Sequence, residues 1–373
     1  MRPPALLFAG CGGMRLELLR ICGLRCLGEV ELVLAPGINV FVGANGAGKT
    51  SVLEAVFLLS RGRSFRSGAK EALIQRGGTG FSVFAELRHA DLRTRRLGLG
   101  REGSRWEAKV DGSSATLAGL VQECAVVCFE PGSHALIAGA AEERRRYLDW
   151  GVFHVEHDFL SSWRRYQRAL KQRNSLLRSS SPPLDDSLFA PWEFELAQTA
   201  QLLDQQREAY LTRLRPRLSA CAASLLPELG PLMLNYRRGW STEQDLAGQL
   251  RVQRRRDLAR GHTTVGAHRA DWSIAFEQAP LREHLSRGQE KLTALAFVLA
   301  QAQLHAECRG EWPVVCLDDL ASELDLTHQA AVVAQLHAAG AQILLTGTEM
   351  PQALRPLSPQ VFHVEQGQLT RLL

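Results

Sequence analysis

The sequence has no long uninterrupted apolar run, and this absence limits where the protein can work. A helix that crosses a bilayer needs about 20 consecutive apolar residues, and no stretch of this chain approaches that length. An integral membrane protein is therefore not expected, and the predicted location is the cytoplasm. With 373 residues and 45% hydrophobic content, the chain has enough material for two or three globular domains.

Cysteine is present, but the spacing typical of a zinc site is missing. Two pairs, Cys22 with Cys26 and Cys124 with Cys128, are separated by three residues rather than by the two residues of a zinc knuckle. Cys128 and Cys316 also lie inside apolar runs. We therefore expect reduced cysteines that serve as small core residues, which is consistent with a reducing cytoplasm.

Lysine is scarce, since only five of the 44 Lys and Arg residues are lysines. Residues 151–261 contain 17 Lys and Arg against 12 Asp and Glu, whereas the remainder contains 27 basic and 27 acidic residues. The net charge of +5 therefore comes from the middle of the chain. Arginine suits bidentate contacts with phosphate, which makes this segment a candidate nucleic-acid surface. The alternative interpretation is a solvated helical face.

The hydrophobic pattern changes twice along the chain. Segments 81–87 and 105–110 alternate like strands, and the second ends at Asp111-Gly112, a hairpin signal. From Glu142 the spacing becomes helical, and from Gly261 strands and helices alternate again. We predict four segments: an N-terminal extension at 1–13, a strand-rich part at 14–150, a basic helical arm at 151–260, and a final part at 261–373. The extension is expected to be disordered, or to be absent from the native protein if translation begins at Met14.

The predicted arm consists of two or more helices that fold back on each other. The first helix has one apolar face, the second has another, and a loop at 178–187 separates them. Pro216 is expected to end or kink the second helix. The predicted faces are Phe159, Trp163, Tyr166, Leu170 and Leu177 in the first helix, and Leu203, Tyr210, Leu211, Leu214 and Leu218 in the second.

A glycine-rich loop stands between an apolar strand at 38–42 and a helix with apolar residues at helical spacing. It fits the phosphate-loop pattern, in which backbone amides surround a β-phosphate, a lysine lies between β- and γ-phosphates, and a hydroxyl ligates Mg²⁺. Lys49 and Thr50 have those last two roles. The predicted ATP-binding residues are Gly43, Ala44, Asn45, Gly46, Ala47, Gly48, Lys49, Thr50 and Ser51.

Two adjacent acids, Asp318 and Asp319, follow the apolar run Pro313–Leu317, which is the Walker B arrangement. A carboxylate at the end of a buried strand can hold a metal ion, and a second can orient the attacking water. We assign Asp318 to Mg²⁺ and Asp319 to the base. A solvated acidic turn is the alternative.

The segment Leu285–Lys291 precedes a helix and resembles the signature motif of ABC-type ATPases. A serine hydroxyl, a glycine amide and the helix dipole together form a receptor for a γ-phosphate. The simpler interpretation is a capping box, because Ser286 is followed three residues later by Gln289. The predicted receptor residues are Ser286, Arg287, Gly288 and Gln289, and Ala321–Asp325 has the form of a D-loop.

In this class of ATPase the signature serine reaches the nucleotide of a second head. ATP should therefore join two chains in an isologous dimer that buries two nucleotides.

Beyond these motifs, the chain resembles the RecF family, which is related to SMC and Rad50 heads. The resemblance covers residues 14 to about 350. It is carried by three further segments, Gly62–Arg66, Phe129–Pro131 with Arg144–Asp149, and Thr264–Asp271.

The resemblance implies an α/β fold, an ABC-type ATPase head with an antiparallel β subdomain and a helical insertion. It also implies slow, DNA-stimulated ATP hydrolysis and an ATP-dependent homodimer on double-stranded DNA and gap junctions. The implied partners are RecR, RecO and RecA, in gap repair and the SOS response. The chain has Ala267 where the family usually has proline. Thr348 follows the strand that in transporters leads to a histidine, so Thr348 is assigned a γ-phosphate or relay role. Arg63 and Arg66 either reach nucleotide or DNA or form salt bridges within the head.

The predicted DNA-binding surface is the basic arm together with the face of the head beside it. Three other functions remain open: a transporter motor, an SMC-type tether, and an architectural DNA binder with a vestigial ATPase. The 243 residues between Gly43 and Ser286 argue against the motor, and the shortness of the arm argues against the tether. The candidate contacts are Arg164, Arg165, Arg168, Arg173, Arg213, Arg215, Arg217, Arg254, Arg255 and Arg256.

Overall fold

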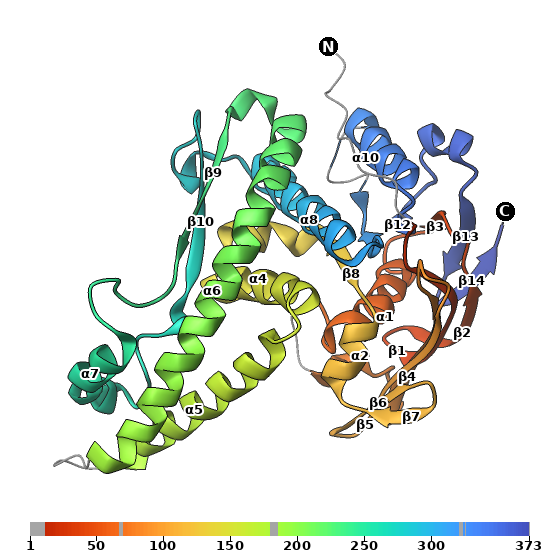
Figure 1. The fold of residues 1–373 in the computed structure, drawn as a ribbon. Coiled ribbons are helices and arrows are strands. Elements are labelled where there is room, and N and C mark those ends of the chain that lie inside the picture. The colour runs from red at the N-terminus through yellow and green to blue at the C-terminus, as the bar shows by residue number, and fades with distance from the viewer. Residues whose placement is uncertain (1–11, 67–69, 180–185, 321–323, 325, 373) are drawn as a thin grey trace. The chain divides into compact units, whose positions relative to one another are not determined.

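The computed structural model describes residues 12–66, 70–179, 186–320, 324 and 326–372. The chain divides into two compact units (Figure 1). The first unit comprises 1–134, 220–227 and 286–373, and the second comprises 135–219 and 228–285. The second unit therefore begins before the predicted arm of 151–260 and ends after it. Most of the predicted extension at 1–13 lies outside the described residues.

A six-stranded sheet with five parallel strands forms the centre of the first unit. Its order is β14-β13-β3-β12-β11-β8, and only the edge strand β14 is antiparallel to its neighbour. Strands covered on both faces are expected to be continuously apolar, and β3, β11 and β12 are buried at every position. The strands are β3 (Ile38–Val42), β8 (Val126–Phe129), β11 (Val314–Leu317), β12 (Ile343–Gly347), β13 (Gln360–Glu365) and β14 (Gln368–Arg371).

A second sheet in the same unit is antiparallel, with the order β2-β1-β4-β5-β6-β7. Asp111 and Gly112 both have left-handed backbone conformations, with φ of 51° and 80°, and they connect β6 to β7. The hairpin predicted at this pair is confirmed. The strands are β1 (Arg15–Leu24), β2 (Leu27–Val33), β4 (Gly80–Arg88), β5 (Thr94–Glu102), β6 (Arg105–Val110) and β7 (Ser113–Ala115).

The first unit also contains α-helices and short 3₁₀ turns. Helix α1 is the most deeply placed, because 11 of its 13 residues are buried. No helix in the described part of the chain combines the length and apolar character that crossing a bilayer demands. The helices are α1 (Lys49–Arg61), α2 (Leu117–Glu123), α8 (Arg287–Arg309) and α10 (Leu326–Ala338), with short 3₁₀ turns η1 (Lys70–Leu73), η2 (Pro131–His134) and η6 (Gln352–Leu357).

The second unit is mainly helical, and its described residues include a two-stranded antiparallel sheet of β9 and β10. Helices α5 and α6 run side by side in Figure 1, and the ion pair between Arg165 and Glu195 at 2.8 Å joins them. The elements are α3 (Ala135–Ala138), α4 (Ala141–Val155), α5 (Phe159–Ser179), α6 (Asp186–Leu225, assigned to this unit up to Ser219), β9 (Leu232–Arg237), α7 (Leu246–Arg260) and β10 (Asp271–Phe276), with the turns η3 (Pro227–Leu229), η4 (Ala267–Arg269) and η5 (Arg282–His284).

The apolar face predicted for α5 is partly wrong. Phe159, Tyr166 and Leu177 are buried, but Trp163 is 37% exposed. The buried face also includes Ser162, Ala169 and Arg173, so it is rotated away from Trp163. Small or ion-paired residues can occupy a packed face, and an apolar pattern does not identify them. The face predicted for α6 is confirmed, since all five of its residues are buried.

Pro216 does not end its helix, because α6 continues to Leu225. Proline removes one backbone hydrogen bond from a helix. Burial of Leu214, Leu218 and Cys221 around that position offsets this loss, and packing therefore overrides the local preference.

A network of buried charges holds α5, α6 and α7 together within the second unit. Arg173 is fully buried and donates to Asp257 at 2.7 Å and to Glu193 at 3.2 Å. Arg254 donates to both oxygens of Glu193 at 2.8 and 2.7 Å, and it also pairs with Asp186. Because each buried charge has a partner of opposite sign, removing one member would leave the others uncompensated.

This network predicts a large difference between two neighbouring arginines. Arg254→Ala should lower the free energy of unfolding by about 3 kcal/mol, because it leaves the buried Glu193 carboxylate with only its 3.2 Å contact to Arg173. Arg255 is exposed, and Arg255→Ala should change stability by less than about 0.5 kcal/mol. Urea unfolding of the two variants measures the difference, and equal stabilities would contradict this account of the network.

Candidate nucleotide-binding site

The glycine-rich loop lies between β3 and α1, as its sequence predicts. All three of its glycines, Gly43, Gly46 and Gly48, have a positive φ, so none of them can be replaced without strain. Gly48 has φ of 116°, a conformation that residues with a Cβ rarely adopt. A Cβ on Gly43 would lie 2.1 Å from the backbone oxygen of Val364. The loop can therefore pass close to β13 and direct the amides at the start of α1 into one pocket.

Lys49 is the first residue of α1, and its side chain reaches back to the start of the loop. Its Nζ donates to the backbone oxygens of Gly43 at 2.7 Å and Ala44 at 2.8 Å. Burial lowers the pKa of Lys49, while the charges of Asp319 and Asp318 oppose that shift. A buried ammonium that is held only by neutral carbonyls and by these acids is well suited to an additional anion such as a phosphate.

The Walker B acid Asp318 joins three elements of the first unit. Its Oδ1 accepts hydrogen bonds from the hydroxyls of Thr50 at 2.9 Å and Thr346 at 2.7 Å. Asp318 is only 2% exposed, and burial raises its pKa, while these two hydrogen bonds lower it. The structure therefore brings together Thr50 and Asp318, the two predicted Mg²⁺ ligands.

The metal assignment fits the chemistry of these side chains. Mg²⁺ prefers oxygen ligands, and in phosphate sites it is commonly held by one or two protein groups together with water and phosphate oxygens. Thr50 and Asp318 supply such oxygens. No cluster of three or more His, Cys, Asp or Glu side chains in the described part of the chain could hold a metal alone.

Asp319, the predicted base, lines the same pocket as the loop. Its backbone has φ of 51°, and its N–H donates to the Thr346 hydroxyl at 2.8 Å. Left-handed backbone is uncommon for residues other than glycine, although aspartate tolerates it better than most. The hydrogen bond from the Asp319 N–H to Thr346 helps to fix this turn.

Thr346 is a residue that sequence reasoning missed, because the relay role was assigned to Thr348. Thr346 is buried at the pocket and contacts both Walker B acids, whereas Thr348 is exposed and does not line the pocket. The available signal was a hydroxyl inside an otherwise apolar strand.

Glu130 is a second residue that sequence reasoning missed. Strand β8 pairs in parallel with β11, and Phe129 lies opposite Leu317, so Glu130 and Asp318 leave the sheet side by side. Glu130 accepts from the N–H of Gly132 at 2.5 Å. Burial raises the pKa of Glu130, and the negative charge of Asp318 raises it further. The sequence signal for Glu130 was an apolar run that ends in an acid, which is the same pattern as Walker B.

The segment Gly62–Arg66 lies beside the loop through a buried acid on α1. Glu54 is fully buried and accepts two hydrogen bonds from Arg25, at 3.0 and 2.7 Å, and one from Ser64. Arg66 lies 3.6 Å from Glu54 and also lines the loop pocket, which has a volume of about 630 Å³. Arg66 therefore forms the ion pair within the head that was one of the two predicted alternatives, while its contact with nucleotide or DNA stays a prediction.

The signature segment begins α8. Ser286 caps the helix, because its hydroxyl accepts from the N–H of Gln289 at 3.2 Å and its own N–H donates to the Gln289 side chain at 3.0 Å. The predicted capping box is confirmed. Ser286, Arg287 and Gly288 are exposed and are not among the residues that line the loop pocket. The predicted D-loop at 321–325 lies outside the described residues except for Leu324.

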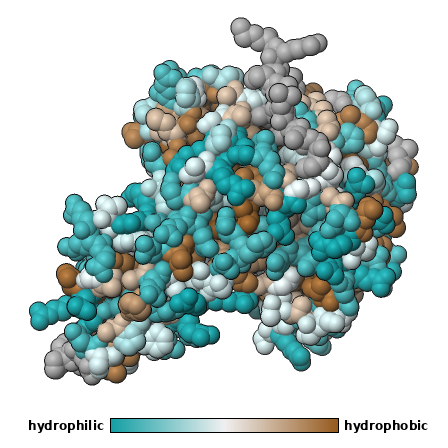
Figure 2. All heavy atoms as spheres, in the orientation of Figure 1, coloured by the Kyte–Doolittle hydropathy of each residue, from teal (hydrophilic) through white to brown (hydrophobic). Residues whose placement is uncertain are grey.

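The predicted DNA contacts fall into two groups. Arg254 is 5% exposed, and Arg173 is fully buried, so both are corrected to structural residues of the ion network. The other candidates are at least partly accessible, and hydrophilic side chains cover most of the face over α5, α6 and α7 in Figure 2. Three have acidic partners, namely Arg165 with Glu195, Arg213 with Glu156 and Arg215 with Glu208, whereas Arg164, Arg168, Arg255 and Arg256 are exposed.

A family model and a curated relative both place this chain in the same family. Residues 15–355 match the family model described as the RecF/RecN/SMC N terminal domain. The chain is 49% identical over 364 residues to the "DNA replication and repair protein RecF" of Stenotrophomonas maltophilia, which covers 95% of this chain and 99% of that protein.

Solved structures agree with the predicted fold. The chain is similar to a structure of the recombination mediator protein RecF with ATP in the RecFOR pathway, with a TM-score of 0.89 and 25% identity over 98% of this chain and 99% of the other. An Smc head domain from Pyrococcus furiosus matches with a TM-score of 0.56 and 15% identity over 96% of each chain, which shows a shared fold. The predicted ABC-type ATPase head is confirmed.

The contacts of Thr346 predict that it matters more than Thr348. Thr346→Val should lower the free energy of unfolding by about 1–2 kcal/mol, because it leaves the buried Asp318 carboxylate with one hydroxyl donor. It should also reduce ATP turnover, since the turn at Asp319 loses its acceptor. Thr348→Val is the matched control. If the two variants have the same stability and turnover, this role of Thr346 is wrong.

The raised pKa values of Glu130 and Asp318 predict how stability depends on pH. The folded protein retains protons that the unfolded chain releases, so the unfolding free energy should fall as pH rises from the ordinary carboxyl range toward these raised values. Glu130→Gln should reduce this fall, whereas the exposed control Glu29→Gln should not. Urea unfolding without metal between about pH 4 and pH 8 measures the slopes, and identical slopes in all three proteins would refute the prediction.

Proposed function

The chain belongs to the RecF family, and from this membership we propose that it is an ATP-dependent DNA-binding protein of replication and recombinational repair. In this proposal, ATP closes two chains into a dimer that binds double-stranded DNA and gap junctions, and hydrolysis releases the dimer. One observation carries the proposal. The phosphate loop and Asp319, the second Walker B acid, line one pocket in the first unit, while the signature serine is exposed outside that pocket.

ATP would bind with its phosphates on the loop amides and Lys49. Thr50 and Asp318 would hold Mg²⁺, which neutralises charge on the β- and γ-phosphates when bound. Asp319 would orient the attacking water. We propose slow hydrolysis that DNA stimulates, because aspartate has a shorter side chain than the glutamate common in transporters and reaches less far toward the water.

Dimerisation follows from the position of the signature segment. Ser286 stands at the N-terminus of the 23-residue helix α8, where the amides of the first turn and the helix dipole favour an anion. This hydroxyl and the exposed Arg287 and Gly288 would meet the γ-phosphate held by the partner chain. Each nucleotide would then be enclosed by residues of both chains, so that ATP binding and dimerisation stabilise each other.

DNA would bind mainly through its phosphates. Arg164, Arg168, Arg255 and Arg256 are exposed, so they can approach a duplex without first breaking a buried ion pair. Arg165, Arg213 and Arg215 would exchange surface partners of small energetic value. Such contacts position DNA without reading its sequence, and they depend strongly on salt.

The pathway is proposed from the relatives. The name of the similar solved structure assigns that protein to the RecFOR pathway. We propose the same pathway here, with RecR and RecO as partners, RecA loaded on single-stranded gaps, and support of SOS induction. The extensive identity along the whole length of a RecF relative supports this assignment.

The test combines DNA binding with molecular mass. Light scattering and binding to gapped DNA would be measured with ATP, with ADP and for Ser286→Arg. The unmodified protein should form a DNA-bound dimer with ATP but not with ADP. Ser286→Arg should bind ATP but neither dimerise nor retain gapped DNA, because its larger side chain occupies the space of the γ-phosphate.

The matched control is Ser104→Arg, which adds the same charge at an exposed serine in the turn between β5 and β6 and not on the helices proposed to contact DNA. It should behave like the unmodified protein. DNA binding that is indifferent both to nucleotide and to Ser286→Arg would contradict the proposal, because the ATPase would then serve a different event.

A further inference from the structure

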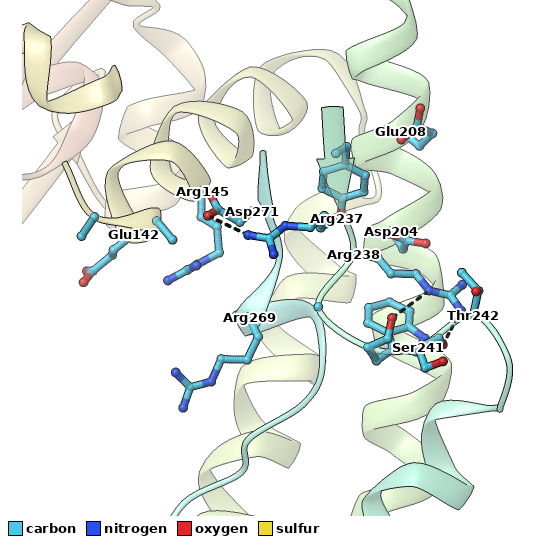
Figure 3. Close-up of a pocket in the computed structure, with 15 residues that line it drawn as sticks. Glu142, Arg145, Asp204, Glu208, Arg237, Arg238, Ser241, Thr242, Arg269 and Asp271 are labelled. Atoms are coloured by element: carbon cyan, nitrogen blue, oxygen red, sulfur yellow. Dashed lines mark hydrogen bonds and ion pairs between the residues drawn. The ribbon is translucent and has the colours of Figure 1, made fainter. Parts of the chain in front are cut away.

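A second pocket lies within the second unit, apart from the phosphate loop. It has a volume of about 1010 Å³. Arg145 from α4, Arg237 from β9, and Arg269 from η4 extend toward the same open region in Figure 3. Arg238 and Trp240 line it as well. Guanidinium groups that converge from three elements have the geometry of an anion site.

The acids that line this pocket are mostly neutralised by other arginines. Asp271 accepts two hydrogen bonds from Arg144, at 2.7 and 3.0 Å, and it also lies 3.6 Å from the guanidinium of Arg237. Glu208 pairs with Arg215 at 2.9 Å, and Glu142 pairs with Arg146. Asp204 is half-buried, and burial raises its pKa. The acids therefore contribute less negative charge to the pocket than their number suggests.

Two of the pocket arginines are not neutralised in this way. Within the described residues, neither Arg145 nor Arg269 has a carboxylate at ion-pairing distance. Arg145 donates to the backbone oxygen of Ala270 at 2.9 Å, and Arg269 donates to that of Thr263 at 3.4 Å. Burial lowers the pKa of Arg145, and the positive charge of Arg207 adds to the effect. The negative charges of Asp271, Asp149 and Glu142 oppose this shift only in part, so an incoming anion would further stabilise the charged guanidinium.

The pocket also offers an aromatic surface on a fixed loop. The Arg238 guanidinium lies over the Trp240 ring, 4.8 Å from its centroid, and leaves the indole partly exposed. The preceding Gly239 has φ of 96°, and a Cβ there would lie 2.4 Å from the backbone oxygen of Gly266. The N–H of Gly266 donates to the oxygen of Gly239 at 3.1 Å, so the Trp240 loop is tied to the segment that carries Arg269.

We propose that this pocket binds one nucleotide of an unpaired DNA strand, with a phosphate on Arg145, Arg237 and Arg269 and the base against Trp240. Single-strand sites commonly combine cationic groups for the backbone with aromatic rings for the bases. This inference rests on the proposed function as a DNA-binding protein and adds recognition of the unpaired strand at a gap. An acidic peptide would satisfy the arginines but would leave the indole without a partner.

The first test is direct binding without ATP, where the dimer is not required. The probe is a fluorescent oligothymidine of about eight nucleotides, followed by anisotropy. The double variant Arg145→Ala with Arg269→Ala should bind about tenfold more weakly and should lower the slope of log affinity against log salt by about 1.4. The control, Arg251→Ala with Arg260→Ala, removes the same charge from exposed positions of α7 and should bind nearly normally.

The second test locates the base. Photocrosslinking with 5-iodouracil in the oligonucleotide should label Trp240, and a Trp240→Ala variant should lose that label. Arg145→Lys retains the positive charge but loses the bidentate guanidinium, so it should also weaken binding. It serves as the test if the alanine variant does not fold. Equal losses in the pocket and control variants, or no crosslink at Trp240, would overturn the proposal. So would a polyglutamate peptide that binds through Arg145 while the oligonucleotide does not.

These outcomes are separable from failure of the proposed function. If ATP does not drive dimerisation on gapped duplex but the oligonucleotide still binds through Arg145 and Arg269, the proposed function fails and the pocket stands. If the ATP-dependent dimer forms on gapped DNA while the oligonucleotide ignores both arginines, the pocket assignment fails alone.

Discussion

The nucleotide site depends on two hydrogen bonds to a single carboxylate oxygen of Asp318. Thr50 reaches it from the first turn of α1, and Thr346 reaches it from β12. The carboxylate is nearly inaccessible to water, and without these donors its burial would favour the protonated form. The two threonines therefore keep a negative charge where a metal ion would need it. Thr346 also accepts from the N–H of Asp319, so the same contact fixes the second acid.

The site is electrostatically unfavourable without its ligands, and this has a functional consequence. Burial lowers the pKa of Lys49 and raises those of Glu130 and Asp318, so each of these charges is partly disfavoured. A magnesium nucleotide supplies both the cation and the anions that such groups need. Binding should thus stabilise this part of the first unit. Ser286 is exposed and does not line this pocket, so it is available to the nucleotide of a second chain.

Sequence reasoning identified contiguous features and missed those that arise from strand order. The phosphate loop, the Walker B run and the capping box are local patterns, and all three are present in the structure. Glu130 was missed because its importance comes from β8 being the parallel neighbour of β11, which no local pattern specifies. Thr346 was passed over for Thr348 although its hydroxyl within an apolar strand was a local signal, because its contacts with Asp318 and Asp319 arise only when β12 pairs with β11. Arg254 was misassigned because its burial depends on Glu193, which lies 61 residues away.

The central claim is that each nucleotide is shared between two chains, and mixing two inactive variants tests it directly. Lys49→Ala removes the loop cation, and Ser286→Arg blocks the receptor, so each variant alone should have little ATPase activity. In a mixed dimer, one site combines an intact Lys49 with an intact Ser286. The account predicts that an equimolar mixture recovers a substantial part of the activity. A mixture as inactive as its components would contradict it, and so would a Ser286→Arg chain that is fully active alone.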